Sequence, residues 1–388
     1  MTRALPLVAA FVLVAGLTGR AQEAAVAPEA LRAAIDQLGN LDFATRMNAA
    51  RTVRRARGAQ AVPALTEAVT GHADGYVRYR ALVLLSGFND PRTESVVLSV
   101  LADPNDRLRA TAYAWLERNP SRQAVEPMLK ALDREESEFV RPDLTRALVA
   151  HAGSDPKLHE VMRQLANRGQ DFFRSVVIEA LGDHGAAYAF AELTRIARLD
   201  GPLQDDAVIA LGKIGDKRAL PLFAALQRSA PRDVQPAIAA SICLLAVNCP
   251  THQAYLLETV RFAVENSGFQ ELLRPAVSAI AAIAARGDAA MVQALIEIGG
   301  PARDPARAPI ALGIGSVALR TAALLLQVLE QQADAGSAIE LLREAFDMLE
   351  EDFAEEQFFS AVRRAYWGAT EGSPTRQAAG MLIRRLEF

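Results

Sequence analysis

The stretch Val77-Arg78-Tyr79-Arg80-Ala81-Leu82-Val83-Leu84-Leu85 sets the pattern of this chain. Its apolar residues Val77, Ala81, Leu84 and Leu85 follow the spacing i, i+4, i+7 and i+8, which puts them on one face of an α-helix. Similar stretches start 31, 32, 33, 30 and 31 residues apart, at Val77, Leu108, Val140, Phe173, Leu203 and Val234. A unit of this length buries its apolar face only against its neighbours, so the repeat predicts a solenoid.

The residues before each stripe predict that every unit contains another helix, which precedes the helix that carries the stripe. In the unit quoted above, Ala61 to Leu65 are expected to open this first helix, with Pro63 in its first turn, where the missing N–H costs least. A polar break from Gly71 to Gly75 separates it from the stripe. The chain is therefore expected to be all-α and built from helix pairs.

The segment Ala207-Val208-Ile209-Ala210-Leu211-Gly212-Lys213-Ile214-Gly215-Asp216-Lys217-Arg218-Ala219-Leu220-Pro221 resembles HEAT repeats, in particular the short bacterial HEAT-like type. The resemblance is strongest from Ala59 to Asn248 and weaker on either side. It implies a right-handed α-solenoid (superhelix) of antiparallel helix pairs, with the second helices lining the concave side. This motif identifies a fold and says almost nothing about function.

The N-terminal residues predict export. Arg3 precedes an uncharged apolar run from Ala4 to Leu17, and Gly19 and Ala21 offer small residues at a cleavage site before Gln22. This layout is typical of a secretory signal peptide over residues 1–21, and it predicts a periplasmic or secreted protein. A buried N-terminal helix or an uncleaved anchor is the alternative.

The remaining chain divides by the regularity of its repeats. We expect an N-terminal segment and capping helix at 22–39, regular repeats at 40–248, irregular repeats at 249–370 and a C-terminal capping helix at 371–388. The irregular part contains a Gly/Pro-rich loop, residues 299–309, which holds three prolines and two glycines. Two interpretations of this loop remain open: it accommodates packing, or it is a functional element.

Arginine follows the first position of the stripe in the early repeats only. The set consists of Arg46, Arg78, Arg109, Arg141 and Arg174, and Gln204 and Gln235 take the position in later repeats. A structural ladder, in which each arginine pairs with an acidic residue of an adjacent turn, is the favoured interpretation. The candidate partners are Asp42, Asp74, Asp103 and Glu135. The alternative is a binding site for an anionic group, because the guanidinium presents a fixed fork of donors to carboxylate or phosphate.

The two ends of the chain differ in charge. Arg51, Arg54, Arg55 and Arg57 make the first repeat basic, whereas Glu330 to Glu356 contain ten acidic residues and one basic residue. Runs of this kind are usually solvated helix faces. A molecule with oppositely charged ends also has a dipole, which would steer a charged partner or favour head-to-tail contacts between copies.

Cys243 and Cys249 are the two cysteines of the chain. Six residues of continuous helix span about 9 Å, which is too far for a disulfide. The helix would have to break near Val247 for the sulfurs to meet. A disulfide and two unpaired thiols are both open at this point.

Catalytic and metal-binding motifs are missing from the sequence. It contains no His-Glu-x-x-His, Gly-x-Ser-x-Gly, P-loop or Cys-x-x-Cys, and the single pair His159-Glu160 is too little for the di-iron centre of HEAT-repeat hydroxylases. We therefore expect no catalytic residues, no metal and no cofactor. A formal charge of −4 argues against nucleic acid as the main partner.

The sequence thus predicts a non-catalytic, exported scaffold that binds a protein or peptide on its concave surface, without an integral membrane segment after signal cleavage. An enzyme or enzyme subunit of the HEAT-like lyase type, with a small-molecule pocket near the 299–309 loop, is the first alternative. The second alternative is a structural envelope component that self-assembles end to end.

Overall fold

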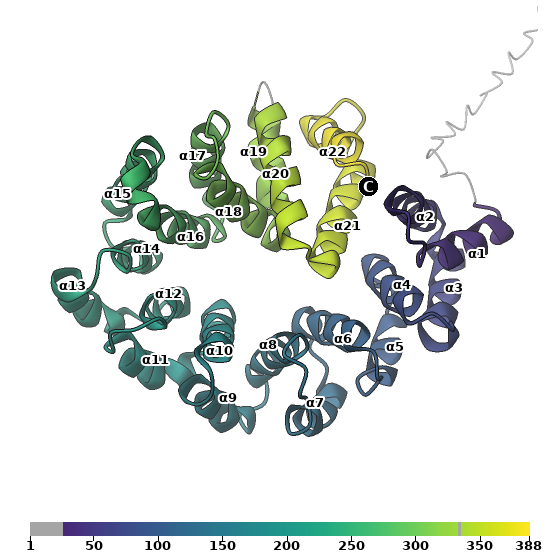
Figure 1. The fold of residues 1–388 in the computed structure, drawn as a ribbon, viewed down its shortest axis with the longest axis horizontal. Helices are drawn as coiled ribbons and strands as arrows, with labels where there is room; N and C mark the ends of the chain where they lie inside the picture. The colour runs from purple at the N-terminus through teal and green to yellow at the C-terminus, as the bar shows by residue number, and fades with distance from the viewer. Residues whose placement is uncertain (1–25, 333–334) are drawn as a thin grey trace, which may run out of the picture.

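The computed structural model describes residues 26–332 and 335–388, and the expected signal peptide lies outside them. Throughout these residues the regular structure is helical, with no strand, which confirms the all-α prediction. The helices form two concentric rows that curve into a nearly closed ring (Figure 1). The chain is thus an α-solenoid of helix pairs, and its right-handed sense stays a prediction.

The outer row contains mostly the first helix of each pair: α1 (Pro28–Gln37), α3 (Gly58–Gly71), α5 (Thr93–Ser99), α7 (Val125–Leu132), α9 (Leu158–Asn167), α11 (Phe190–Ala197), α13 (Leu220–Ser229), α15 (Cys249–Glu265), α17 (Ala289–Gly299), α19 (Ala322–Gln331) and α22 (Pro374–Arg385). The inner row contains mostly the second helices: α2 (Phe43–Arg55), α4 (Gly75–Gly87), α6 (Asp106–Arg118), α8 (Arg141–Ala152), α10 (Asp171–Asp183), α12 (Gln204–Ile214), α14 (Gln235–Leu244), α16 (Leu273–Ala284), α18 (Arg307–Arg320), α20 (Gly336–Leu349) and α21 (Asp352–Gly368). Short 3₁₀ turns at Arg122–Ala124, Ala187–Ala189, Lys217–Ala219 and Ser267–Leu272 lead into four of these helices.

The apolar stripes form the core between the two rows. Val77, Ala81, Leu84 and Leu85 are all buried, as the helical spacing predicts. The prediction for Pro63 is wrong, because α3 begins at Gly58 and the proline lies inside the helix. Pro63 is on the solvent side, so water can hydrate the carbonyl that its missing N–H leaves without a helical partner.

Small residues let neighbouring inner helices approach closely. At Gly212 of α12, an added Cβ atom would lie 2.7 Å from the Cα of Ser241 on α14. Ser241 is fully buried, and its hydroxyl donates to the carbonyl of Val208 at 2.9 Å. The serine that interrupts the apolar stripe of its repeat is therefore a satisfied contact between two closely packed helices.

The solenoid closes on itself, because α21 packs against α4 (Figure 1). Glu356 of α21 forms an ion pair with Arg54 of α2 at 2.7 Å, and both side chains are at most 5% exposed. The Ser360 hydroxyl donates to the carbonyl of Gly87 at 2.6 Å, and the Gln357 amide donates to the Ser86 hydroxyl at 2.8 Å. We call these contacts of α21 with α2 and α4 the seam.

The seam buries one residue of each charged run, whereas most other described residues of the two runs are exposed, as the interpretation as solvated faces predicts. Arg54 and Glu356 are buried against each other, and Arg51 pairs with Glu387 at 3.0 Å. Asp352 at the start of α21 pairs with Arg80 of α4. One pair from the two oppositely charged runs, Arg54 and Glu356, thus meets within one molecule, because the accumulated curvature of the repeats brings the ends together.

Hydropathy along the helices gives one further observation. Within the described residues, no individual helix is long and apolar enough to cross a membrane. The pair α18 and α19 passes that test of length and composition jointly, but it is bent by 115° at the break between the two helices.

Candidate binding pocket on the concave face

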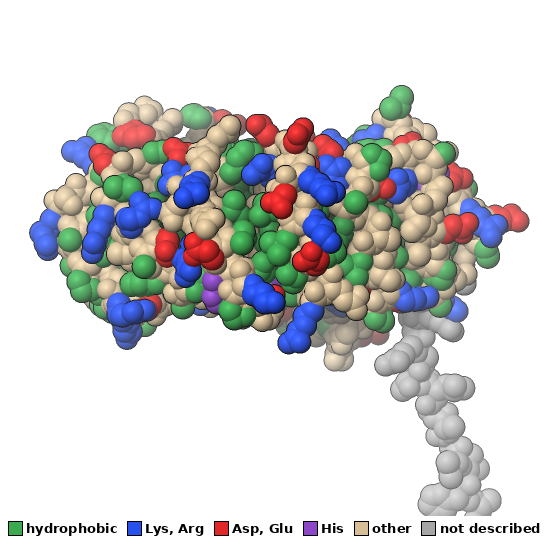
Figure 2. All heavy atoms as spheres, turned by 90° about the horizontal axis from the view of Figure 1, so that it is seen from below, with side chains coloured by type: hydrophobic (Ala, Val, Ile, Leu, Met, Phe, Trp, Pro, Cys, Tyr) green, Lys and Arg blue, Asp and Glu red, His purple; other side chains and the backbone are tan. Residues whose placement is uncertain are grey.

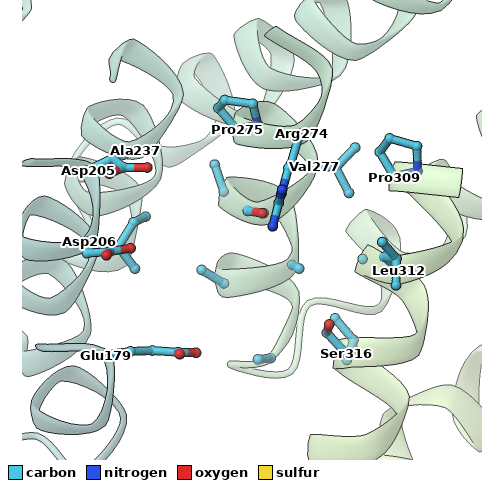
Figure 3. A pocket seen from close by; sticks show the side chains of 18 of the residues that line it. Glu179, Asp205, Asp206, Ala237, Arg274, Pro275, Val277, Pro309, Leu312 and Ser316 are labelled. Atoms are coloured by element: carbon cyan, nitrogen blue, oxygen red, sulfur yellow. The ribbon is translucent and has the colours of Figure 1, made fainter. Parts of the chain in front are cut away.

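A pocket of about 870 Å³ opens on the concave side, between α12, α16 and α18. Figure 3 shows Asp205, Asp206 and Glu179 on one wall and Pro309, Leu312 and Ser316 on the opposite wall. The two walls therefore differ in chemistry, one being acidic and the other mainly apolar. The convex face seen in Figure 2 shows no such division, since acidic, basic and apolar side chains are interspersed over it.

The acidic wall comes mainly from the first turn of α12. The Asp206 carboxylate accepts a hydrogen bond from the Ser175 hydroxyl at 2.5 Å, and burial raises the pKa of Asp206 to about 6. Burial also raises the pKa of Asp205. Neither aspartate has an ion-pair partner among the residues that the structure describes. A cation that entered the pocket would therefore meet two carboxylates that are not held in an ion pair.

Lys213 and Arg320 lie on the lining of the same pocket but are already paired. Both bind the Asp183 carboxylate, at 2.6 and 2.9 Å. Burial opposes the ionisation of Asp183, but Arg320, Lys213 and Arg146 together lower its pKa below the ordinary value. Arg320 also pairs with Glu179 at 2.5 Å, so this contact ties α18 to α10 across the pocket.

Arg274 of α16 extends along the front of the pocket (Figure 3). It is exposed, and it has no ion pair with any described residue. Arg274 and the two aspartates face the same space from different helices. Among the described residues, the pocket thus presents one basic group and two acidic groups without ion-pair partners next to an apolar wall. This arrangement suits a partner with both polar and apolar parts.

The Gly/Pro-rich loop borders this pocket, to which Pro305 contributes directly. Arg307 holds the loop in place by donating to the carbonyls of Gly299 and Gly300 at 3.0 and 2.9 Å and to Glu344 at 2.8 Å. The loop therefore both packs and lines a cavity, and its functional role remains a hypothesis.

The five arginines of the early repeats lie at successive inner helices rather than around one site. Each donates to a backbone carbonyl of its own helix pair: Arg46 to Asn40 and Leu41, Arg78 to Val69, Arg109 to Asp103, Arg141 to Glu135 and Arg174 to Ala166. Arg78 also pairs with Asp103, and Arg109 binds both carboxylate oxygens of Glu135 at 2.9 Å. These partners lie 25 and 26 residues further along the chain, in the next repeat. A ligand-binding role of the set stays a prediction.

The two cysteines are joined by a disulfide. The inner helix α14 ends at Leu244 and α15 begins at Cys249, so the helix is broken between them. Ala246 and Asn248 in this turn have positive φ angles of 57° and 46°. The break near Val247 that a disulfide requires is thus present.

Sequence reasoning did not single out Asp205, Asp206 or Arg274. The two aspartates occupy variable positions of the repeat, directly after Gln204, where the row of arginines ends. That change of residue type was the available signal. Their common pocket depends on the curvature of the solenoid, which no single repeat encodes. The described residues contain no group of His, Cys, Asp and Glu that is arranged to hold a metal ion.

Comparisons with known proteins agree with the repeat architecture. A family model described as HEAT repeats matches residues 67–149 and 94–182, and one described as PBS lyase HEAT-like repeat matches residues 203–229. No curated protein matches the chain.

Several solved structures are similar to it at low identity. An engineered protein is 16% identical with a TM-score of 0.35, covering 92% of this chain and 99% of its own. The CpcE–CpcF complex of phycocyanin lyase from Nostoc sp. PCC7120 is 19% identical with a TM-score of 0.25, covering 89% and 100%. Kap121p bound to Pho4p is 12% identical with a TM-score of 0.34, covering 92% of this chain and 51% of its own. At these TM-scores the likeness carries no argument about binding or catalysis.

The repeated helix pairs and the two family matches lead to the same assignment. The chain belongs to the HEAT-repeat family.

Proposed function

We propose that this protein is an exported scaffold that binds an extended peptide segment of a protein partner in the concave pocket. The observation that carries the proposal is the pocket itself, in which Asp205 and Asp206 face an apolar wall across about 870 Å³. A basic side chain of the partner would lie against the aspartates, and the apolar residues beside it would pack on Pro309 and Leu312. An acidic group of the partner would reach Arg274.

The ion pairs already present within the chain favour this pocket over the five arginines of the early repeats as the binding site. Arg78 and Arg109 already hold carboxylates and carbonyls of their own chain. A ligand would have to displace these partners, whereas the two aspartates of the pocket have no ion pair to break. Binding energy comes mainly from groups that are preorganised and not yet compensated.

Two features support the proposal of export. The apolar run from Ala4 to Leu17 behind Arg3 has the layout of a signal peptide. The disulfide between Cys243 and Cys249 is of a kind that persists in oxidising compartments and is rare in the cytosol. Fractionation of expressing cells tests export: the mature protein should be found in the periplasm or medium, without residues 1–21.

Peptide binding is tested with capped octapeptides of Ala, Leu and Pro that carry one central Arg, norleucine or Glu. The Arg peptide should bind about tenfold more tightly than the norleucine peptide, and the Glu peptide most weakly. Double substitution of Asp205→Asn and Asp206→Asn should remove the preference for Arg. Asp200→Asn, an exposed loop position outside the pocket, is the matched control and should leave the affinities unchanged.

The pH dependence gives a second readout. Because burial raises the pKa of Asp206 to about 6, its carboxylate loses charge below that pH. Affinity for the Arg peptide should therefore fall as the pH drops from 7 to 5, while affinity for the norleucine peptide stays flat. Equal affinities for all three peptides, or a preference for Arg that survives both Asn substitutions, would exclude the pocket as the peptide site.

A small-molecule pocket of the HEAT-like lyase type is the second candidate. The residues matched by the PBS lyase HEAT-like repeat model, 203–229, include both aspartates of the acidic wall. The volume also lies in the range of small-molecule sites, about 300–1,000 Å³. Protein purified from its native source should then carry a bound compound, visible in the native mass or the absorption spectrum. A clean mass and spectrum would count against this candidate.

A further inference from the structure

Arginine side chains gather around the C-terminal half of α21, which lies next to α2 and α22 where the ring closes (Figure 1). Arg363 of α21 and Arg54 of α2 share one carboxylate, that of Glu356, at 3.0 and 2.7 Å. The Nη1 atoms of both arginines have no hydrogen-bond partner among the described residues. Burial, together with the neighbouring Arg54 and Arg364, lowers the pKa of Arg363. This part of the seam therefore holds more guanidinium groups than its carboxylate can compensate.

Three further arginines extend the positive charge toward solvent. Arg364 of α21 is exposed. Arg376 of α22 lies over the Tyr366 ring, 4.8 Å from its centroid. Arg384 of α22 is exposed and lies beside the same ring, because a Cβ atom added to Gly380 would be 3.3 Å from the Arg384 Nη1 atom and 3.0 Å from the Tyr366 ring. None of the three arginines forms an ion pair with a described residue.

Few carboxylates oppose these arginines. Residues 360–388 contain five arginines and two glutamates, although the whole chain has a formal charge of −4. Glu387 is paired with Arg51 at 3.0 Å, which leaves Glu371 as the glutamate of this segment without an ion pair to any described residue. The segment is thus a local basic surface on an acidic protein.

An exposed aromatic side chain lies among the arginines. Trp367 is 49% exposed and lies one helical turn after Arg363 and Arg364. Its ring packs against Tyr366 with 5.0 Å between the centroids, and Arg376 lies 5.9 Å from its centroid. Indole rings are enriched at membrane–water interfaces, and clustered arginines bind anionic headgroups.

We propose that the surface around Trp367, with Arg364, Arg376 and Arg384, docks onto an anionic lipid membrane. The guanidinium groups would donate to phosphodiester oxygens of the headgroups, which match their fork of donors. The indole ring would enter the headgroup region beside them. A fluid layer of phosphates can adjust to arginines that come from two different helices, whereas one peptide would have to match their positions.

The docking surface is separate from the proposed peptide site. None of its residues lines the concave pocket. Membrane docking therefore does not rest on the proposed function and adds a second kind of partner to it. A chain held in this way would present its pocket next to a lipid surface.

Sedimentation with vesicles tests the proposal on the chain from Gln22 onward. This chain keeps every described residue and lacks the apolar run from Ala4 to Leu17, which would bind any bilayer. Vesicles of phosphatidylglycerol and phosphatidylcholine in equal parts are compared with vesicles of phosphatidylcholine alone. The chain should bind the mixed vesicles about a hundredfold more tightly, because each of the three arginines contributes about fivefold. Added salt should weaken this binding, because it screens exposed charges.

Matched variants assign the binding to the arginines. Arg364→Gln combined with Arg384→Gln removes two exposed guanidinium groups and should weaken binding to the mixed vesicles about 25-fold. Arg122→Gln combined with Arg168→Gln is the control. These two arginines are also exposed, form no ion pair with a described residue and lie next to α7 and α9, across the ring (Figure 1). The control has the same change in net charge and should bind like the unmodified chain.

Tryptophan fluorescence gives a second measurement without any change to the arginines. The chain has two tryptophans, Trp115 and Trp367. Its emission should shift to shorter wavelength with the mixed vesicles, because the indole of Trp367 leaves water. The shift should disappear in Trp367→Phe, which keeps Trp115.

Three results would overturn the proposal. The first is equal sedimentation with both kinds of vesicle and an unchanged emission. The second is a preference for phosphatidylglycerol that survives the Arg364→Gln and Arg384→Gln substitutions. The third is binding of an octaglutamate peptide by the same arginines without binding of vesicles, which would make the surface a protein interface. Normal vesicle binding without peptide binding in the pocket would instead refute the proposed function alone.

Discussion

Arg54 and Glu356 form the buried ion pair at the seam, and we expect their replacement to lower the free energy of unfolding by unequal amounts. Glu356 contacts two arginines, Arg54 at 2.7 Å and Arg363 at 3.0 Å. After Arg54→Met, the glutamate keeps Arg363, and the methionine still fills the space beside Phe359, whose ring centroid lies 5.3 Å from the Arg54 guanidinium. After Glu356→Leu, two guanidinium groups remain in the seam without their carboxylate.

Burial sets the magnitude of this difference. The side chains of Glu356, Arg54 and Arg363 are 1%, 5% and 20% exposed. The Nη1 atoms of both arginines already have no hydrogen-bond partner among the described residues. Loss of the glutamate would therefore leave further buried N–H groups of each arginine without an acceptor. Removing one partner of a buried pair costs about 3–5 kcal/mol when it leaves an uncompensated charge. We expect a loss in this range for Glu356→Leu and about 1–2 kcal/mol for Arg54→Met, because one ion pair survives.

Urea unfolding followed by circular dichroism measures these losses, and X-ray scattering reports whether the ring opens before the helices melt. Glu340→Leu, on the exposed face of α20, serves as the control for adding a leucine. If Arg54→Met proves as costly as Glu356→Leu, or more so, then the second arginine does not compensate the glutamate, and the electrostatic account of the seam is wrong.

Three further changes test the packing at other points. Gly87→Ala should destabilise the seam by about 1–3 kcal/mol, because the added Cβ atom would lie 2.5 Å from the carboxylate of Glu356. Gly71→Ala is the control: its Cβ atom meets nothing within 4 Å, so this variant should be neutral or stabilising in the same urea titration. Arg109→Met should lower the unfolding free energy by about 1–3 kcal/mol and leave peptide affinity unchanged; unchanged stability with lost binding would instead indicate a ligand site. Replacing Cys243 and Cys249 by serine should cost about 2 kcal/mol, the chain-entropy value for so short a loop, and a urea midpoint equal to that of the oxidised protein would contradict it.

The apolar periodicity made most of the helical architecture predictable. Residues such as Val77 and Leu84 are buried by their own and the adjacent repeats, so their spacing alone indicates the fold. The same local logic accounts for Arg109, whose partner Glu135 is 26 residues away, within one repeat. The sequence pattern was wrong for Pro63, which it placed in the first turn of a helix. The proline lies inside α3, where its exposed position lets water hydrate the unpaired carbonyl.

The candidate site was not predictable in the same way. Asp206 and Arg274 occupy variable positions and share a pocket only because the solenoid bends over the repeat between them. The acidic run near the C-terminus has the composition of a solvated face, and burial of Glu356 depends on an arginine 302 residues earlier in the chain.

The sequence by itself therefore determined the repeating helix pair, its apolar face and its arginine position, because the contacts that stabilise them lie within about one period along the chain. Only the tertiary structure decided that the two ends meet, that their opposite charges form a seam, and that a pocket opens on the concave face. The physical reason is that a small rotation at each repeat accumulates over the whole solenoid. The sequence of a single repeat does not reveal this accumulated rotation, so no local pattern predicts the pocket or the seam.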